Sequence, residues 1–480
     1  MALIMNQLFI FPFLISFSLF FSFTTLQTSS FEFTTSVFNV TTAILQIRQV
    51  LPFKTFHHQE EETQFTTPAF STSSSSSFKL KLYPIESIFI AHPQHKDYRS
   101  LVRTRLRYDS NRVSRIRSKI QPDYLSGDVF NGITQGTSDY IVKIGVGRPA
   151  QFFYMIFDIE TDVTWLQCQP CINCYEQPDS IFDPSLSSSY TLISCETKQC
   201  KLLQNSSCSV DGYCKYKISY NDGAYTEGVF INETISFESS GWVNRVSLGC
   251  GHSNQGTFVG SAGTFGLGRG PLSFLSRINV SSMSYCLVDH NWVYSSATLE
   301  FNSPSYNDNS FNAKLLKNPK MEDLYYVGFA GVSVGSERIT IPNSTFTIDP
   351  YGNGGMIVST GTIITRLETE AYNAVRDAFV EKTRHLERAK ALYPFDTCYS
   401  LLAKNTVELP ILEFEVNDGK MWLLPKESYL YAVDDNGTFC FAFGPSEGSF
   451  SILGSFQQYG TRVTFDVTNS VISLHTHYCN

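Results

Sequence analysis

The sequence predicts an all-β fold of two lobes, built mostly from antiparallel sheets with a few short helices. Short apolar segments such as Tyr140–Val146 (YIVKIGV) alternate with turn residues through most of the chain. Helical windows are few, and the clearest one spans Glu368–Ala391. A short apolar strand that delivers a small polar loop occurs twice, at Phe157–Trp165 (FDIETDVTW) and at Gly354–Leu367 (GGMIVSTGTIITRL). This internal repeat indicates two related lobes.

The chain length indicates more than one domain, and the N-terminal residues indicate export through the secretory pathway. A chain of 480 residues is too long for one ordinary core, so at least two domains are expected. The apolar run Leu8–Phe23 predicts a signal peptide over residues 1–27, although no Lys or Arg precedes Arg48. An uncleaved anchor is the alternative, because the run approaches the length that spans a bilayer. We expect a secreted protein, extracellular or vacuolar, with no membrane span once the signal is removed.

Cysteines and glycosylation motifs agree with export. The chain has 12 cysteines, an even number that predicts disulfides in an exported protein, without fixing which cysteines pair. These are Cys168, Cys171, Cys174, Cys195, Cys200, Cys208, Cys214, Cys250, Cys286, Cys398, Cys440 and Cys479. The spacing at 168, 171 and 174 also suits a metal or iron–sulfur site, but an oxidising compartment favours bridges. Glycosylation sequons occur at Asn205, Asn232, Asn279, Asn343 and Asn436.

Residues 28–127 differ from the rest of the chain in composition and charge. Ser71–Ser77 is of low complexity, and Lys96–Lys119 carries nine basic residues with apolar residues at helical spacing. Residues 1–127 hold 13 Lys and Arg against 8 Asp and Glu, which leaves 23 against 36 for residues 128–480. A basic helix before an acidic body predicts a propeptide that covers an acidic cleft and leaves when carboxylates become protonated. A solvated basic helix is the alternative, and a nucleic-acid partner is not expected in an exported chain.

The repeated loops resemble those of the pepsin-like aspartic peptidases, in which each lobe supplies one Asp-Thr/Ser-Gly loop to a shared active site. Behind the loops, Thr264-Phe265-Gly266 and Ile452-Leu453-Gly454 also repeat. The closest resemblance is to the plant nepenthesin-like branch, with its DTGSDxxW and DSGTxxTRL motifs and a cysteine-rich insertion. It implies a pepsin-like bilobal fold, with an N-terminal lobe over residues 128–310 and a C-terminal lobe over residues 311–480. It also implies no cofactor and no metal.

The resemblance places Asp158 at the first catalytic position and Ser359 at the second. Hydrolysis in this family needs two carboxyl groups that share one proton, one acting as base and the other as acid. A serine hydroxyl has no proton to exchange at working pH. Ile159 replaces the hydroxyl residue that braces the two loops in the family, whereas Thr360 keeps that hydroxyl on the other side. Glu160 replaces a small glycine, so the dyad is incomplete and its surroundings are altered.

Three alternatives for the site remain open. Glu160 lies on the same side as Asp158 if the loop is extended, and so it is a candidate surrogate for the missing carboxyl group. A water held by Ser359 is another route to activity. A metal site formed by Asp158, Glu160 and Asp162 lacks the further ligands of a calcium loop. Isolated histidines without a Ser or Cys signature give no support to serine or cysteine catalysis.

The functional prediction follows from these departures. Tyr220 begins the turn Tyr220-Asn221-Asp222-Gly223, which matches the family's flap over bound peptide, although an ordinary β-turn has the same composition. The sequence predicts a monomeric pepsin-like homologue that binds a peptide or protein between its lobes and cleaves poorly. An extracellular enzyme held as an inhibited partner has precedent among plant relatives with a broken dyad. An active aspartic endopeptidase is the competing hypothesis.

Overall fold

The computed structural model describes most of the chain beyond residue 33, and residues 33–480 form one compact unit. The described ranges are residues 34–50, 78–85, 97–120, 140–220, 223–237, 241–256, 258, 260–278, 280–289, 297–302, 310–416, 418–446, 448–476 and 479. The predicted signal peptide and the serine-rich stretch at residues 71–77 lie outside these ranges. No helix in the described ranges is long and apolar enough to cross a bilayer.

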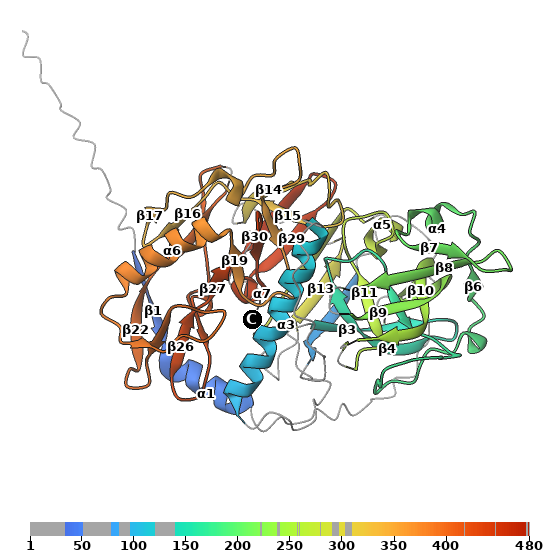
Figure 1. The fold of residues 1–480 in the computed structure, drawn as a ribbon, viewed down its shortest axis with the longest axis horizontal. Helices are drawn as coiled ribbons and strands as arrows, with labels where there is room; N and C mark the ends of the chain where they lie inside the picture. The colour runs from blue at the N-terminus through green and yellow to red at the C-terminus, as the bar shows by residue number, and fades with distance from the viewer. Residues whose placement is uncertain are drawn as a thin grey trace, which may run out of the picture. The chain divides into compact units, whose positions relative to one another are not determined.

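Strand is the commonest regular element of the described chain, as the alternating sequence pattern predicts (Figure 1). Before the middle of the chain the strands are β1 (Thr35–Asn39), β2 (Phe78–Pro84), β3 (Tyr140–Val146), β4 (Gln151–Asp158), β5 (Trp165–Gln167), β6 (Thr191–Leu192), β7 (Ser206–Cys208), β8 (Cys214–Ser219), β9 (Tyr225–Phe237), β10 (Gly241–Gln255), β11 (Gly263–Gly266), β12 (Ser282–Cys286) and β13 (Ala297–Phe301). After it they are β14 (Phe311–Leu316), β15 (Tyr326–Gly328), β16 (Gly331–Val334), β17 (Glu337–Arg338), β18 (Met356–Val358), β19 (Thr365–Leu367), β20 (Arg388–Ala389), β21 (Cys398–Ser400), β22 (Thr406–Pro410), β23 (Leu412–Glu415), β24 (Met421–Leu423), β25 (Leu430–Ala432), β26 (Thr438–Phe441), β27 (Phe443–Pro445), β28 (Ser451–Leu453), β29 (Arg462–Asp466) and β30 (Val471–His475).

The internal repeat is visible in the strand pairing. Strand β4 runs parallel to β11, with Asp158 opposite Gly266, and β11 also pairs with β5 in antiparallel fashion. In the second half β18 runs parallel to β28, and β28 also pairs with β19 in antiparallel fashion. The same correspondence holds at the next position, since β5 is parallel to β10 and β19 is parallel to β27. The two loops are therefore carried by equivalent strands, with the predicted second elements of the repeat behind them.

One continuous path of hydrogen-bonded strands connects the two loops. It runs through β4, β3, β2, β13, β12, β29, β30, β14, β15 and β18, and every step in it is antiparallel. Fully buried apolar side chains from both halves of this path, such as Met283, Tyr285 and Phe465, belong to one core. The two loops therefore rest on a common framework. The expected boundary near residue 310 adjoins residues outside the described ranges and stays a prediction.

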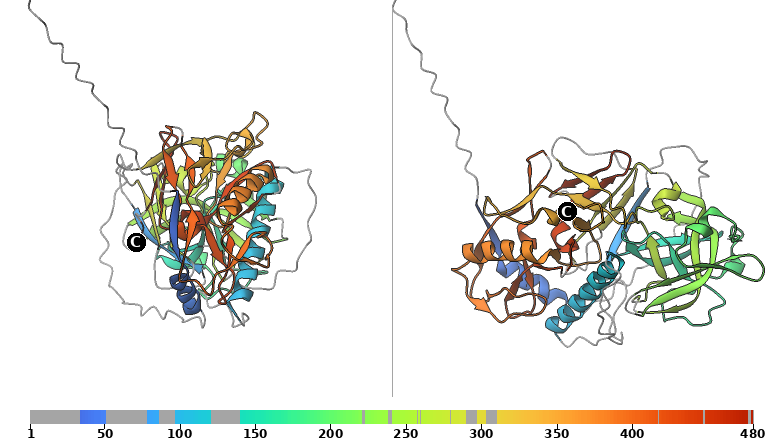
Figure 2. Two further views of the ribbon diagram at one scale, coloured as in Figure 1. Left: turned by 90° about the vertical axis from the view of Figure 1, so that its left-hand side faces the viewer. Right: turned by 45° about the horizontal axis from the view of Figure 1, so that its top comes forward.

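The segment before residue 128 is built into the sheets as well as lying over them. Strand β1 pairs with β22, where Thr35 faces Pro410. Strand β2 lies between β3 and β13, with Leu82 opposite both Val142 and Ala297. The basic stretch forms one long helix, and the ribbon views show it running along the C-terminal half of the chain (Figures 1 and 2).

The helices are few, as predicted, and one of them is shorter than the sequence pattern indicates. They are α1 (Val40–Val50), α3 (Tyr98–Ile120), α4 (Lys198–Leu202), α5 (Phe274–Ile278), α6 (Thr369–Lys382) and α7 (Ser455–Gln458). The window from residue 368 to residue 391 yields only α6, so the predicted end was wrong. The Thr383 hydroxyl donates to the carbonyl of Phe379 (2.7 Å), and the chain leaves the helix there. Residues Arg388 and Ala389 then pair with β21 instead.

All twelve cysteines are paired, and none is free. The six disulfides are Cys168–Cys250, Cys171–Cys174, Cys195–Cys208, Cys200–Cys214, Cys286–Cys479 and Cys398–Cys440. The three closely spaced cysteines at 168, 171 and 174 therefore lie in two bridges. Disulfide-bonded sulfurs are not available as thiolate ligands, so the metal-site alternative for these three cysteines is wrong.

Candidate functional site

Two loops at the ends of equivalent strands form the centre of the site. Asp158 is the last residue of β4, and Ser359 directly follows β18. Asp158 is 4% exposed, Glu160 is 2% exposed and Ser359 is fully buried. Buried polar groups of this kind need hydrogen-bond or charge partners, and the structure provides them in an unusual arrangement.

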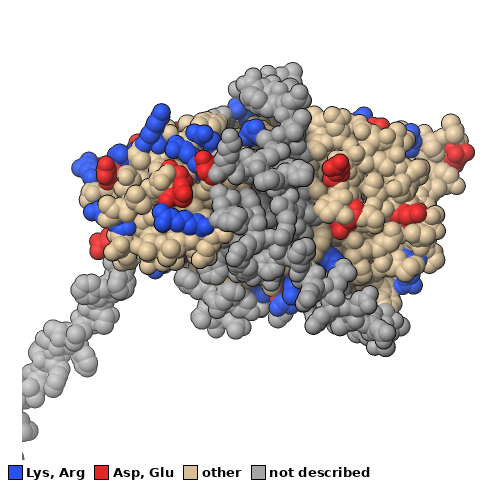
Figure 3. Space-filling model, turned by 90° about the horizontal axis from the view of Figure 1, so that it is seen from below, with Lys and Arg blue, Asp and Glu red and all other residues tan. Residues whose placement is uncertain are grey.

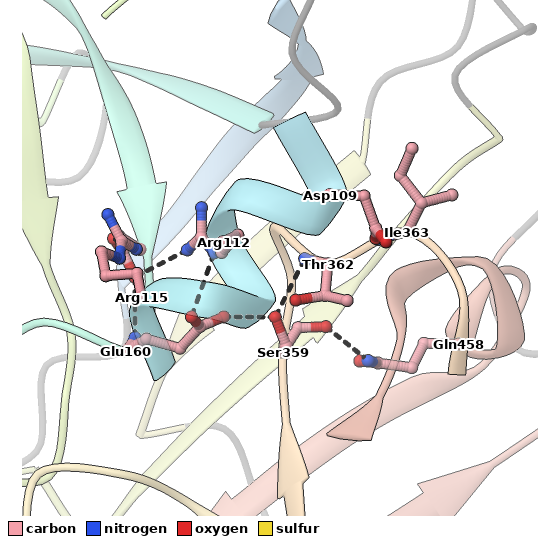
Figure 4. Close-up of polar contacts among 9 residues, drawn as sticks. Asp109, Arg112, Arg115, Glu160, Ser359, Thr362, Ile363 and Gln458 are labelled. Carbon is pink, nitrogen blue, oxygen red and sulfur yellow. Dashed lines mark hydrogen bonds and ion pairs between the residues drawn. The ribbon is translucent and has the colours of Figure 1, made fainter. Parts of the chain in front are cut away.

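The Glu160 side chain reaches across to the second loop. The Ser359 hydroxyl donates a short hydrogen bond to Oε1 of Glu160, while Ser359 Oγ accepts one from the backbone N–H of Thr362 (2.9 Å). The backbone N–H of Glu160 in turn donates to Oδ1 of Asp158 (2.8 Å). The Ser359 carbonyl accepts from Nε2 of Gln458 (2.9 Å; Figure 4). The Glu160 carboxylate of the first loop thus lies against the hydroxyl of Ser359, the residue at the second catalytic position.

Two arginines of α3 complete the site from the other side. The guanidinium of Arg112 lies with Nη2 at 3.1 Å from Oδ1 of Asp158 and with Nε at 3.0 Å from Oε2 of Glu160. Arg115 contributes a longer ion pair, with Nη2 at 3.9 Å from Oδ2 of Asp158. Figure 4 shows both arginines projecting from the helix toward the loop that carries Glu160. Two positive side chains therefore face two negative ones.

Asp109, one turn before Arg112, anchors the same helix to the second loop. Its Oδ1 accepts a hydrogen bond from the backbone N–H of Ile363 (2.6 Å), and its Oδ2 forms a short ion pair with Arg366. Asp109 is fully buried, and Arg366 is 4% exposed. Because α3 binds one loop through its carboxylate and the other through its arginines, it contacts both halves of the repeat.

Apolar side chains hold α3 on either side of these polar contacts. Leu101, Val102 and Leu106 pack in one cluster with Ile363 and Ile364 of the second loop. Three further residues of α3 pack in another cluster with β15, β18 and β28, and these are Val113, Ile116 and Ile120. Asp97 caps the helix, since its Oδ1 accepts from the backbone N–H of Ser100 (2.7 Å). The helix is therefore amphipathic, with its apolar stripe on the C-terminal half.

The hydroxyl brace expected from the family pattern is not formed in this structure. Thr360 is 1% exposed, and its hydroxyl has no hydrogen-bond partner among the residues that the structure describes. Ile159, in the equivalent position of the first loop, is fully buried and belongs to the apolar core. A brace needs a hydroxyl on both loops. The substitution at Ile159 leaves Thr360 without its counterpart.

The predicted flap lies close to the site. Tyr220 and Gly223 close a β-turn between β8 and β9, with the N–H of Gly223 at 3.1 Å from the carbonyl of Tyr220. Asn221 and Asp222 lie outside the described residues. The Tyr220 hydroxyl accepts a hydrogen bond from Nε1 of Trp165 (3.2 Å). The guanidinium carbon of Arg115 lies 5.3 Å from the centre of the Tyr220 ring, within range of a cation–π contact.

Two further residues support the loops. Asp162 accepts a hydrogen bond at Oδ1 from the backbone N–H of Gly270 (2.8 Å), which gives it a structural role. No group of three or more potential metal ligands occurs in the described ranges. Tyr285 donates its hydroxyl to Oε1 of Gln458 (2.6 Å) beneath Ser359. Burial, and then the charge of Glu160, raises the pKa of Tyr285 well above its usual value, so this hydroxyl stays a donor.

The loops and the basic helix are evident from the sequence, but the side chains of the helix that enter the site were not predicted. Asp109, Arg112 and Arg115 follow one another at intervals of three, which places them on one helical face. That spacing was the available signal. Arg366 gave no signal, because its partner lies 257 positions away in the sequence.

The predicted glycosylation sites differ in accessibility. Asn205, Asn343 and Asn436 are exposed. Asn232 is half-buried in β9, and its side-chain oxygen accepts from the Ser247 hydroxyl (2.9 Å). Asn279 lies outside the described residues. Three of the five positions are therefore accessible to a glycosyltransferase in the folded chain.

Comparison with known proteins assigns the family. The family models described as "Xylanase inhibitor N-terminal" and "Xylanase inhibitor C-terminal" match residues 140–300 and 324–476. Protein ASPARTIC PROTEASE IN GUARD CELL 2 of Arabidopsis thaliana is 37% identical over 430 residues, which cover 86% of this chain and 90% of that protein. Aspartic proteinase nepenthesin-2 of Nepenthes gracilis is 32% identical over 384 residues, covering 79% and 86%.

Solved structures agree on the fold. The structure of edgp superposes with a TM-score of 0.63 at 18% identity, covering 85% of this chain and 96% of that one. An aspartic proteinase from Irpex lacteus superposes with a TM-score of 0.50 at 17% identity, covering 71% and 95%. The all-β bilobal prediction is confirmed. The chain belongs to the pepsin-like aspartic protease family, in its plant nepenthesin-like branch.

Proposed function

We propose that this protein is a peptide- or protein-binding member of the family that has lost efficient peptide hydrolysis. The observation that carries the proposal is the hydrogen bond from Ser359 to Glu160. A serine hydroxyl can donate one hydrogen bond, and here Glu160 accepts it. Ser359 therefore has no proton left to polarise a substrate carbonyl, and its oxygen already accepts from Thr362.

Charge matching supports the same conclusion. An active pair in this family shares one proton, so that one member acts as an acid while the other acts as a base. Asp158 and Glu160 instead face Arg112 and Arg115. Each carboxylate of the site therefore has a cation as its partner, whereas an active pair has one carboxyl group facing the other. Loss of general acid–base help is worth about 10²–10⁴ in rate.

A second candidate function is an active aspartic endopeptidase with Asp158 and Glu160 as its pair. One observation favours it: the Glu160 carboxylate lies at the tip of Ser359, where the second catalytic acid would be expected. Without the arginines, Asp158 and Glu160 would be the two acidic side chains left at the site, and the family's mechanism uses two. The two candidates differ in a measurable property, which is peptide cleavage at acid pH.

The test is a cleavage assay between pH 3 and 6 with an unfolded protein substrate, run on the full chain and on protein from which α3 has been removed by proteolysis, because α3 contacts both loops in the full chain. We expect no pepstatin-sensitive cleavage by the wild-type chain. Cleavage that pepstatin blocks and that both Asp158→Asn and Glu160→Gln abolish would overturn the proposal in favour of the second candidate. Cleavage that remains in both variants would come from a contaminating protease. That protease is removed by further purification before the wild type is assayed.

A restored enzyme provides the positive control. The triple variant Ile159→Thr, Glu160→Gly and Ser359→Asp rebuilds the family pattern in both loops. We expect it to gain pepstatin-sensitive turnover of at least about 10²-fold over the wild type, and to lose it again when Asp158→Asn is added. A folded triple variant without turnover would show that other features also block catalysis.

The partner class and the compartment are part of the proposal. The family models carry the description xylanase inhibitor, which supports an extracellular enzyme as a bound partner. Six disulfides and three exposed sequons support secretion or delivery to the vacuole. On the described part of one face, Lys and Arg are interspersed with Asp and Glu (Figure 3). We propose a monomer that acts on a peptide or protein ligand, without nucleic acid or a cofactor.

A further inference from the structure

We propose that the acidic pair of this site is a receptor for an arginine side chain, and that the partner of the released protein presents an arginine to it. This inference rests on the proposed binding function and names the chemistry of its ligand. Three features of the site carry it: the way in which Arg112 is held, the surroundings of its guanidinium, and the charge that remains when α3 departs.

Arg112 contacts both acidic side chains of the site, through a hydrogen bond to Glu160 and an ion pair with Asp158. Its Nε lies 3.0 Å from Glu160 and its Nη2 lies 3.1 Å from Asp158, so two different nitrogens of one planar group meet two different carboxylates. Both carboxylates are more than nine-tenths buried. A lysine ammonium is a compact point charge and lacks the fixed fork that spans two acceptors. The arrangement therefore selects for shape as well as for charge.

The surroundings fit a flat cationic group. A side-chain carbon added at Gly361 would lie 2.0 Å from Nη1 of Arg112, so the guanidinium approaches the backbone of the second loop where no side chain intervenes. On the flap side, the Tyr220 ring already receives the second guanidinium, that of Arg115, at 5.3 Å. Aromatic rings favour guanidinium groups over their faces. Glycine, tyrosine and two carboxylates together form a site with the features of an arginine receptor.

Once α3 has left, the two acidic side chains of the site have lost the arginines that faced them. Asp158 and Glu160 stay with the body of the protein, whereas Arg112 and Arg115 belong to the basic segment. Without α3 the two carboxylates have lost both their cationic partners and the helix that covers them, so the site is open to a cation from another molecule. Binding of an arginine from another protein would restore the pairing that the structure shows. The arginines of α3 therefore indicate the chemistry of the ligand that binds after α3 has left.

Chemical rescue on the full chain tests this inference. Arg112→Ala leaves α3 in place and vacates the volume of one guanidinium beside Glu160 and Asp158. We expect its melting temperature at pH 7 to fall below that of the wild type and to rise again with millimolar methylguanidine. Methylammonium should need roughly tenfold or more higher concentration, because it makes fewer charge-assisted hydrogen bonds. Arg112→Gln, which keeps a polar chain, provides a second host if the alanine variant does not fold.

Matched variants decide the outcome. Arg384→Ala removes an arginine whose side chain is 73% exposed, and it should show no rescue. Adding Glu160→Gln to Arg112→Ala should abolish the preference for methylguanidine. Equal rescue by both cations, no rescue, or rescue that persists without Glu160 would overturn the inference. These results are independent of the cleavage assay: peptide hydrolysis would overturn the proposed function alone, and failed rescue would overturn the arginine receptor alone.

Discussion

Asp109 offers the sharpest test of how the basic segment is held. Its carboxylate is fully buried, accepts a hydrogen bond from the N–H of Ile363 and forms an ion pair with the buried Arg366. Asp109→Ala leaves Arg366 buried with its main counter-charge removed. Removal of one member of a buried ion pair typically costs about 3–5 kcal/mol. Since tenfold corresponds to about 1.4 kcal/mol, the undocked population of α3 should rise by at least about 10²-fold.

Limited trypsin digestion measures this population, because α3 is rich in arginine and a docked helix resists cleavage. At pH 7.5 and low trypsin, the rate of cleavage within α3 should increase by about the same factor as the undocked population. Asp377→Asn provides a control with the same change of charge, on a side chain that is 70% exposed in α6. Its cleavage rate within α3 should match that of the wild type.

A double variant separates the contribution of the Asp109–Arg366 ion pair to docking from that of the other contacts of α3. In Asp109→Ala with Arg366→Leu, no buried charge is left without its partner, so a substantial part of the lost docking free energy should return. Unchanged trypsin cleavage in Asp109→Ala would refute the reasoning, because it would mean that the apolar clusters alone hold α3. The pairing would be refuted if α3 in the double variant were cleaved faster than the added effects of Asp109→Ala and Arg366→Leu predict.

Three further predictions concern other parts of the structure. Burial raises the pKa of Glu300 and the hydrogen bond from Arg462 lowers it, with a net lowering, so Glu300→Gln should reduce the urea midpoint at pH 7. The difference should begin to shrink as pH falls below about 4.5 and disappear below the lowered pKa of the folded state. Replacement of both Cys286 and Cys479, which lie 193 positions apart, by serine should cost about 2–5 kcal/mol of unfolding free energy, measured by urea denaturation. Gly361→Ala places a methyl group 2.0 Å from a guanidinium nitrogen of α3, and it should accelerate trypsin cleavage of that helix.

The parts of the site that depend on local patterns could be predicted from the sequence. The two loops were identified because an apolar strand, a polar loop and a second strand recur in order along the chain, and the structure shows the same order in its parallel strand pairs. The resemblance to the pepsin-like family then assigned Asp158 and Ser359 to the catalytic positions. The basic helix was found from periodicity and charge, both of which are local. The sequence also held an unused signal in β2, where Lys79 and Lys81 alternate with Leu80 and Leu82.

The parts that depend on distant contacts could not be predicted. The direction of the Glu160 side chain is set by Ser359 and Arg112, which approach from two other segments of the chain. In an extended loop its carboxylate was expected beside Asp158, whereas it reaches the opposite loop. The pairing of Asp109 with Arg366 likewise joins residues that share no local pattern. Long-range side-chain geometry of this kind follows from the packed fold, and a single sequence does not encode it in any short motif.

The two departures from the family pattern compensate each other in charge. Ser359 removes one carboxylate from the second loop, and Glu160 adds one to the first, so the loops keep the same number of acidic residues as the pattern DTG and DSG provides. What changes is chemistry: the added acid lies on the same loop as Asp158 and accepts the hydrogen bond of the Ser359 hydroxyl. The attraction that docks a basic helix is therefore retained while the facing pair of acids is lost. The two acidic side chains thus keep their attraction for a cation, which supports binding, without the arrangement of acids that hydrolysis needs.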